Sequence, residues 1–173
     1  MYAAIGNGGT IWQASIAKAI VKTDGTVIKT IEPNKLGTLT TAPSTVKFLQ
    51  GALREVVVSG TGAGVFAGFP IEISGKTGTG QVFGRNPNGT LKDDTSWFAS
   101  YAPSKNPRFA VVMMVGQGGF GASTSGVGVK AIYEAIFGVK GNKVVPGAAI
   151  YPNGKPPTTL PKISPATKPK EVP

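Results

Sequence analysis

The residues of this chain that are best suited to chemistry are a lysine and two threonines set among glycines at residues 73–83. Lys76 is followed by Thr77, Gly78 and Thr79, and strand-forming residues stand on both sides. Glycine weakens a strand because it packs nothing, but it leaves room for another backbone or a ligand to approach. The lysine ammonium offers three hydrogen-bond donors, and each threonine hydroxyl adds one. The segment therefore predicts an open strand edge that binds an extended, peptide-like substrate ending in a carboxylate.

The composition narrows the chemistry by what it lacks. The chain contains no histidine and no cysteine. This excludes a Ser-His-Asp triad, an imidazole metal site, a thiolate nucleophile and a thiolate zinc site within the chain. If the protein performs acyl transfer, a lysine has to accept the proton that a histidine would otherwise take. No metal and no cofactor is predicted.

Three other segments accompany the lysine strand in a specific order. They are YAAIGNGGT at residues 2–10, DTSWFASYAP at 94–103 and FAVVMMV at 109–115. A lone Lys-Thr-Gly tripeptide more often belongs to an ordinary turn with a solvated lysine, but the ordered set is far more specific. Over residues 1–138 the chain resembles the C-terminal half of the transpeptidase domain of a class B penicillin-binding protein, of an actinobacterial type.

The resemblance implies an α+β fold, namely the C-terminal portion of the penicillin-recognising transpeptidase fold, with antiparallel strands flanked by helices. Turn signals and periodicity predict the elements that hold the lysine strand in place. In chain order they are the end of a helix at 1–5, a hairpin of 16–21 and 26–31, a helix capped by Ser44 with a stripe of Val46, Leu49, Leu53 and Val56, a strand at 95–101, a central strand at 109–115, and a helix capped by Ser123 or Ser125 with a buried stripe of Val129, Ile132, Tyr133, Ile136 and Phe137.

Two matches to the other active-site motifs of this family are rejected on their context. Residues 15–18 (SIAK) fit Ser-x-x-Lys, but the nucleophile has to begin a helix so that its lysine lies one turn later on the same face. Ser15 instead leads into a β-branched hairpin arm, where Ser15 and Lys18 point to opposite faces. Residues 104–106 (SKN) fit Ser-x-Asn, but they follow Lys76 and lie in a proline-flanked turn. The nucleophile and its base are therefore predicted to lie outside this chain.

The resemblance implies half of an active site. The hydroxyls of Thr77 and Thr79, with Lys76, would hold the terminal carboxylate of a D-alanyl-D-alanine stem peptide, and Gly78 would let its backbone approach. The backbone N–H of Thr79 would be one half of the oxyanion hole, and the strand from Thr79 to Val82, which includes Gln81, would pair with the peptide. The implied partners are the peptidoglycan stem peptide, β-lactam antibiotics and the N-terminal remainder of the transpeptidase domain.

Two other functions fit parts of the sequence. Gly116, Gly118 and Gly121 match the Gly-x-Gly-x-x-Gly pattern of a dinucleotide site between a strand and a helix. However, no second parallel strand ending in an acid is predicted after that helix. The formal charge of +10 permits an anionic partner such as nucleic acid or cell wall. Half of it lies in residues 139–173, and the remainder shows no basic helix or interleaved aromatic and basic strand, so nucleic acid is not favoured.

The two ends of the chain differ in character. Residues 139–173 hold eight of the 14 prolines and six of the 18 basic residues. This predicts an extended, mobile tail without a core of its own after a first part at 1–138. No apolar run reaches the roughly 18 residues of a membrane span, and no signal peptide is recognised. The chain is predicted to begin inside a domain, and the resemblance implies an N-terminal anchor and a location at the extracytoplasmic face of the bacterial plasma membrane.

Overall fold

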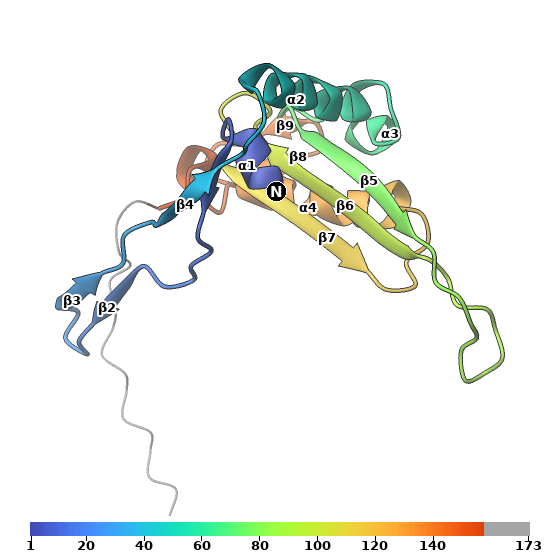
Figure 1. Cartoon of the computed structure of the whole chain (residues 1–173), viewed down its shortest axis with the longest axis horizontal. Coiled ribbons are helices and arrows are strands. Elements are labelled where there is room, and N and C mark those ends of the chain that lie inside the picture. Colours follow the sequence, from blue (N-terminus) through green and yellow to red (C-terminus); the bar gives the residue numbers. More distant parts are fainter. Residues whose placement is uncertain (158–173) are drawn as a thin grey trace, which may run out of the picture.

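The computed structural model describes residues 1–157, and its centre is a three-stranded antiparallel sheet (Figure 1). The strands are β5 (Ser74–Gly80), β6 (Thr95–Ala102) and β7 (Phe109–Val115), in the order β5–β6–β7. Lys76 pairs with Ala99, and Phe98 pairs with Met113. The lysine strand is thus an edge strand.

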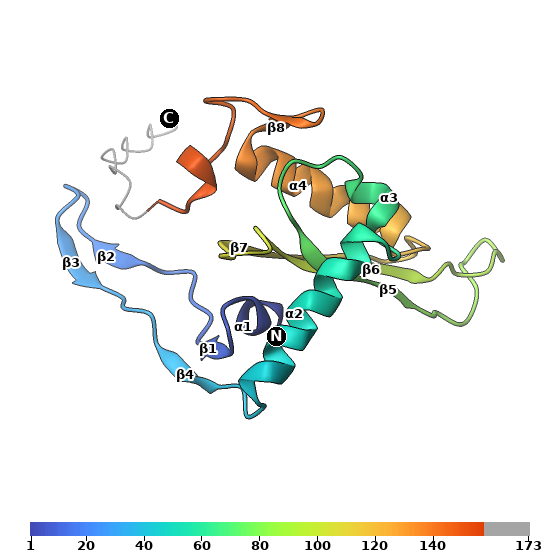
Figure 2. The same ribbon diagram turned by 90° about the horizontal axis from the view of Figure 1, so that it is seen from above.

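Helices cover the sheet unequally. Figure 2 shows α3 (Ala63–Phe66) and α4 (Val127–Phe137) on one side of the sheet and α1 (Tyr2–Gly6) on the other, while α2 (Pro43–Val58) crosses beside β5. This mixture of antiparallel strands and helices confirms the predicted α+β class.

The face of the sheet toward α4 carries the core. Phe98 and Tyr133 are both completely buried, and burying one large apolar side chain stabilises a fold by about 1.5–3 kcal/mol. The core residues come from both layers: Val57, Phe66, Ile73, Phe98, Ala102, Val129, Tyr133, Ile136, Phe137 and Val139. On the opposite face Val112 and Met114 remain more than half exposed. Side chains alternate between faces along a strand, so β6 and β7 each contribute to both environments.

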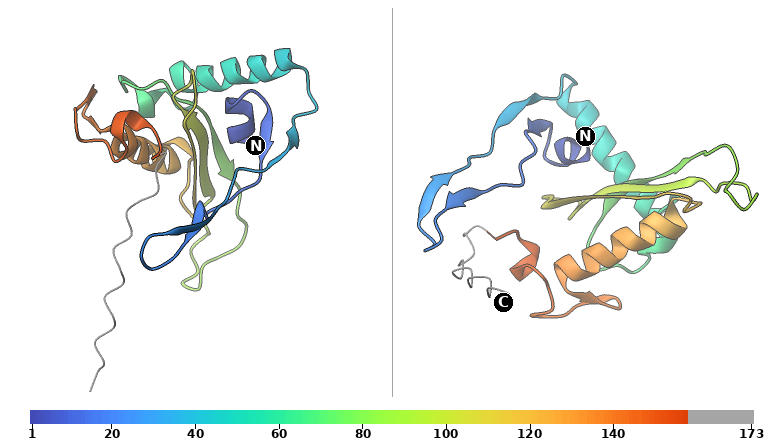
Figure 3. Two further views of the ribbon diagram at one scale, coloured as in Figure 1. Left: turned by 90° about the vertical axis from the view of Figure 1, so that its left-hand side faces the viewer. Right: turned by 90° about the horizontal axis from the view of Figure 1, so that it is seen from below.

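A separate arm extends away from the sheet, as Figures 2 and 3 show. In it β1 (Thr10–Trp12) pairs with β4 (Lys35–Thr38), and β2 (Ala19–Val21) pairs with β3 (Val27–Thr30). Gly25 has φ +88° at the turn between β2 and β3, a conformation that glycine adopts without steric cost. The predicted hairpin around Asp24-Gly25 is confirmed, but its first strand begins at Ala19 and not at Ile16, so Ser15 and Lys18 lie outside the strand that was predicted to hold them.

Several predicted details differ from the structure. The strand β7 lies at an edge of the described sheet, so the prediction of a central strand is wrong for the described residues. Within its apolar run only every second side chain faces the core, and the others are exposed. Ser44 does not cap α2, which begins at Pro43 after Ala42 without a side-chain cap. Proline at the start of a helix has the required φ and needs no N–H partner.

The start of the last helix also differs. Residues Ala122–Gly126 form one π-helical turn before α4, and neither Ser123 nor Ser125 caps that helix. Ser125 is instead completely buried, and its Oγ accepts a hydrogen bond from Ser96 at 2.9 Å. Of the predicted apolar stripes, Leu49 and Ile132 are 37% and 40% exposed, so both stripes are narrower than expected.

The packed part of the chain continues past Gly138. Short strands β8 (Val139–Lys140) and β9 (Lys143–Val144) pair, and a 3₁₀ turn, η2 (Pro152–Gly154), follows. Val139 is 5% exposed and belongs to the core, and Tyr151 stacks on Phe109 with ring centres 5.7 Å apart. Val139, Tyr151 and Gly154 of the predicted tail therefore pack on the domain, while 158–173 lie outside the described residues.

A buried tyrosine joins the sheet to α4 and predicts an alkaline limit of stability. The Tyr133 hydroxyl lies 3.0 Å from Ser100 Oγ, and burial raises its pKa from 10.0 to about 12. The folded protein therefore holds this proton more tightly than the unfolded chain, so its contribution is complete below about pH 10 and is lost toward pH 12. We expect Tyr133→Phe to flatten the loss of unfolding free energy between about pH 10 and 11.5, measured by urea denaturation. A parallel loss in both proteins would assign the limit to other groups.

Candidate functional site

The free edge of β5 exposes backbone groups. The carbonyl oxygen of Ile73 accepts a hydrogen bond from Arg54 Nη1 at 3.0 Å, and that of Thr77 accepts one from Lys76 Nζ at 2.9 Å. These carbonyls therefore point away from β6. Backbone groups of a paired strand alternate in direction with a period of two residues. The N–H of Thr79 is thus directed to the same open edge.

Lys76 lies at this edge with its ammonium close to the backbone. Its side chain is exposed, and Nζ donates to the carbonyl oxygen of Thr77 at 2.9 Å and to Thr77 Oγ1 at 3.2 Å. Within residues 1–157 no carboxylate forms an ion pair with it. One of its three donors is left for a ligand, beside the Thr79 N–H.

The hydroxyl of Thr77 has a partner that the sequence analysis missed. Thr77 is only 8% exposed, and its Oγ1 lies 2.7 Å from Thr61 Oγ1. Thr61 belongs to the Gly-rich segment between α2 and α3, which the sequence marks only as the end of a helix. The sequence signal was the hydroxyl of Thr61 between two glycines. The neighbouring residues do not indicate which strand that hydroxyl contacts.

Glycines keep the middle of β5 thin. A Cβ at Gly78 would lie 3.1 Å from Trp97 Cβ, and the Trp97 ring extends over Gly80. On the opposite face Gly121 lies directly against the strand, because a Cβ there would come within 2.5 Å of Gly78 O and 2.7 Å of Trp97 O. The N–H of Gly121 donates to Thr79 Oγ1 at 3.4 Å. Trp97 on one face and Gly121 on the other therefore fix the position of β5.

Beyond Gly80 the chain leaves the sheet as a long loop to β6, which projects past the end of the sheet (Figure 3). Gln81 is exposed at its start. The next residue, Val82, donates its N–H to Asp94 Oδ1 at 3.2 Å, which ties the two ends of the loop together. Gln81 therefore follows directly after the end of β5, beyond Lys76 and Thr79 in the strand direction.

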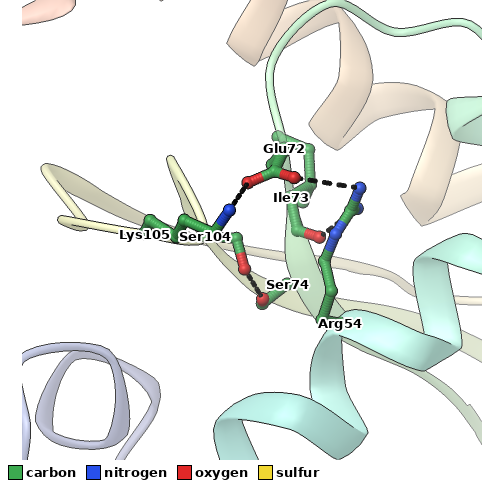
Figure 4. A network of polar contacts seen from close by, with 6 residues as sticks. All are labelled: Arg54, Glu72, Ile73, Ser74, Ser104 and Lys105. Carbon is green, nitrogen blue, oxygen red and sulfur yellow. Dashed lines mark hydrogen bonds and ion pairs between the residues drawn. The ribbon is translucent and has the colours of Figure 1, made fainter.

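The start of β5 is anchored by a polar network (Figure 4). Glu72 lies 3.9 Å from Arg54 Nη2 and 3.8 Å from Lys105 Nζ, and the Ser74 and Ser104 hydroxyls bond to each other. The Ser-x-Asn match at residues 104–106 is thus part of this anchor, away from Thr79. These contacts hold the strand between α2 and the β6–β7 turn.

The Ser-x-x-Lys match is far from this geometry. Ser15 lies in an irregular segment and not at a helix start, and its Oγ donates to the carbonyl oxygen of Ala17 at 2.9 Å. Lys18 Nζ donates to the carbonyl oxygen of Pro157 at 3.2 Å. The rejection of this motif agrees with the structure.

The glycine pattern after β7 is explained by packing. A Cβ at Gly118 would lie 2.9 Å from Val115, and Gly121 touches the backbone of β5 and β6. The helix α4 leads into the β8–β9 hairpin, and every strand pair in the described residues is antiparallel. A dinucleotide site requires a parallel βαβ unit, so the structure does not support that alternative. Among residues 1–157 no three acidic side chains gather as metal ligands, and none of the helices has the length and apolarity to cross a membrane.

Comparisons with known proteins identify the fold. Residues 1–138 match the family model described as the penicillin binding protein transpeptidase domain. The peptidoglycan D,D-transpeptidase MrdA of Haemophilus influenzae is 36% identical over 75 residues, which are 39% of this chain and 12% of MrdA.

Solved structures agree over a larger part of the chain. Pseudomonas aeruginosa PBP2, in complex with WCK 5153, matches with a TM-score of 0.66 and 27% identity, over 87% of this chain and 32% of that one. A penicillin G acyl-enzyme of penicillin-binding protein A from M. tuberculosis matches with a TM-score of 0.61 and 23% identity, over 78% of this chain and 30% of that one. The chain thus spans about a third of these structures. It belongs to the family of penicillin-binding protein transpeptidase domains.

Proposed function

We propose that this chain forms the substrate-binding edge of a serine D,D-transpeptidase that cross-links peptidoglycan stem peptides and is acylated by β-lactams. The observation that carries the proposal is the open edge of β5, where the Lys76 ammonium and the Thr79 N–H face the same side. Both are donors, and both suit an anionic or developing anionic oxygen.

The roles follow from the reaction. A serine oxygen attacks the carbonyl of the penultimate D-alanine, the C–N bond breaks, and the last D-alanine leaves with a proton. An amine of a second stem peptide then attacks the ester, forms the cross-link and frees the serine. The Thr79 N–H would stabilise the oxyanion of each tetrahedral intermediate, and the loss of one such donor costs about 2.7–4 kcal/mol.

Binding of the substrate would use the same edge. Lys76 and the hydroxyls of Thr77 and Thr79 would hold the terminal carboxylate, while the backbone from Thr79 through Gln81 would pair with the peptide as an added strand. Gly78 lies between these groups and carries no side chain that could obstruct the approach. Trp97 would support the strand from its neighbour without touching the reacting atoms.

The nucleophile would come from the N-terminal remainder of the transpeptidase domain. Supporting observations are the free edge of β7 and the exposed Val112 and Met114 on one face of the described sheet. An apolar sheet face of this kind normally packs against another layer. An N-terminal anchor outside this chain would place the protein at the extracytoplasmic face of the plasma membrane, and the actinobacterial type remains part of the proposal.

The proposal predicts that this chain alone forms no covalent adduct with a fluorescent penicillin, because it lacks the nucleophile. The complete protein should be labelled stoichiometrically, as denaturing gel fluorescence and intact mass would show. Ser15→Ala in the complete protein serves as the control and should leave labelling unchanged. Stable labelling of the isolated chain that disappears in Ser15→Ala would reinstate Ser15, and an unlabelled complete protein would contradict the proposed function.

A further inference from the structure

Thr61 contacts the polar groups of β5 through Thr77, although 16 residues separate the two threonines. Its Oγ1 is 2.7 Å from Thr77 Oγ1, which also accepts a hydrogen bond from Lys76 Nζ at 3.2 Å. The Thr77 hydroxyl therefore has two polar neighbours before any ligand is bound. These contacts determine which hydrogen-bond donors and acceptors of the two threonine hydroxyls remain for a ligand.

A threonine hydroxyl has one hydrogen and two lone pairs. Lys76 occupies one lone pair of Thr77 Oγ1. If Thr61 donates, the second lone pair is filled, and the hydrogen of Thr77 needs an acceptor elsewhere. If Thr77 donates, the hydrogen of Thr61 needs one. Neither hydroxyl has a further acceptor among the described residues, so in both arrangements one O–H remains as a free donor beside the ammonium.

The segment that carries Thr61 is fixed by backbone contacts with the end of α2. Gly60 N donates to Glu55 O at 3.0 Å, and Gly62 N donates to Val56 O at 2.9 Å. A Cβ at Gly60 would lie 2.8 Å from Val56 Cα, which shows how closely the turn approaches the helix. The backbone that carries Thr61 is therefore held in place in advance, which lowers the entropy lost when its hydroxyl acts on a ligand.

We propose that Thr61 is a positioning residue for recognition of the terminal carboxylate. The Thr61–Thr77 hydroxyl pair, and not Thr77 alone, presents the O–H that binds this group together with the Lys76 ammonium. A carboxylate suits this cluster because it only accepts hydrogen bonds, and in either arrangement the cluster offers one free O–H beside the free N–H of the Lys76 ammonium. The inference rests on the proposed function and deepens it by naming the group that directs the donor.

The test compares acylation of the complete protein by a β-lactam with a free carboxylate and by its methyl ester. Thr61→Val keeps the shape of the side chain and removes the hydroxyl. We expect it to slow acylation by the acid about tenfold, equivalent to about 1.4 kcal/mol, and to leave acylation by the ester nearly unchanged. Thr61→Ser retains the hydroxyl and should restore the preference for the acid.

Thr45→Val is the matched control, because Thr45 is an exposed threonine of α2 whose hydroxyl makes no hydrogen bond among the described residues. It should behave as wild type. Equal slowing with acid and ester, or no slowing with either, overturns the positioning role of Thr61. If the wild-type complete protein reacts with neither compound, the proposed function itself fails, and this result differs from any effect of the Thr61 variants.

Discussion

Lys76→Ala in the complete protein is expected to slow acylation by a β-lactam by about 10–10²-fold, because a hydrogen bond to a charged group such as the terminal carboxylate contributes about 1.5–3 kcal/mol. The ammonium is the only charge at the open edge of β5 among residues 74–80, and its position is fixed by two hydrogen bonds to Thr77. Alanine removes the charge and both bonds. Stopped-flow acylation with a chromogenic cephalosporin measures the effect.

Two further variants define the cause. Lys47→Ala removes an exposed lysine of α2 and should react like wild type, since only the overall charge changes. Lys76→Arg keeps the charge, but a planar guanidinium cannot place a compact ammonium at the same point, so we expect only partial recovery. A rate for Lys76→Ala within threefold of wild type would remove Lys76 from the site.

Gly121→Ala is expected to destabilise this chain by about 3 kcal/mol, near the upper range for overpacking. The new methyl group would come within 2.5 Å of Gly78 O and 2.7 Å of Trp97 O. Both are backbone atoms of the sheet and cannot rotate away. The π-helical turn after Gly121 would be pushed off β5, and the Thr79 N–H would shift with the strand. Urea denaturation of this chain and acylation of the complete protein should both report the damage.

Gly116→Ala is the matched control, since a Cβ at Gly116 meets no atom within 4 Å. Both glycines belong to the same Gly-x-Gly-x-x-Gly pattern, but only Gly121 is closely packed. A loss of stability in Gly121→Ala alone would therefore assign that glycine to packing and not to a nucleotide-binding loop. Equal stability of the two variants would show that the loop after β7 adjusts freely, against the close contact described above.

The sheet was predictable from the sequence because its signals are local. The β5 strand has strand-forming flanks around the Lys-Thr-Gly segment, and β6 and β7 are runs of apolar and aromatic residues separated by a proline turn. Such patterns fix strand existence well and its place in the sheet poorly. That is why the apolar run of β7 indicated a central strand, whereas the described sheet has it at an edge.

The sequence could suggest candidate site residues only within the Lys-Thr-Gly motif itself. Thr61 contacts Thr77 through the approach of α2 to β5, a long-range contact that no local pattern encodes. Ser125 gave a cap signal, but tertiary packing places it against Ser96 in the interior. Val139 and Tyr151 lie in a proline-rich, basic segment whose composition suggests a tail, yet their apolar side chains find partners in the core. Composition averages over such individual contacts.

The order β5–β6–β7 follows the order of the chain, and this has a consequence for how the protein folds. Each strand pairs with its nearest neighbour in sequence, so the sheet assembles from contacts that are local in the chain. Even the long loop between β5 and β6 adds little cost, because the entropy of loop closure rises only slowly with loop length. The open edge of β5, which we propose binds the carboxylate, can therefore form early and locally. Assembly of a working catalyst would then be limited by the later docking of the segment that brings the serine.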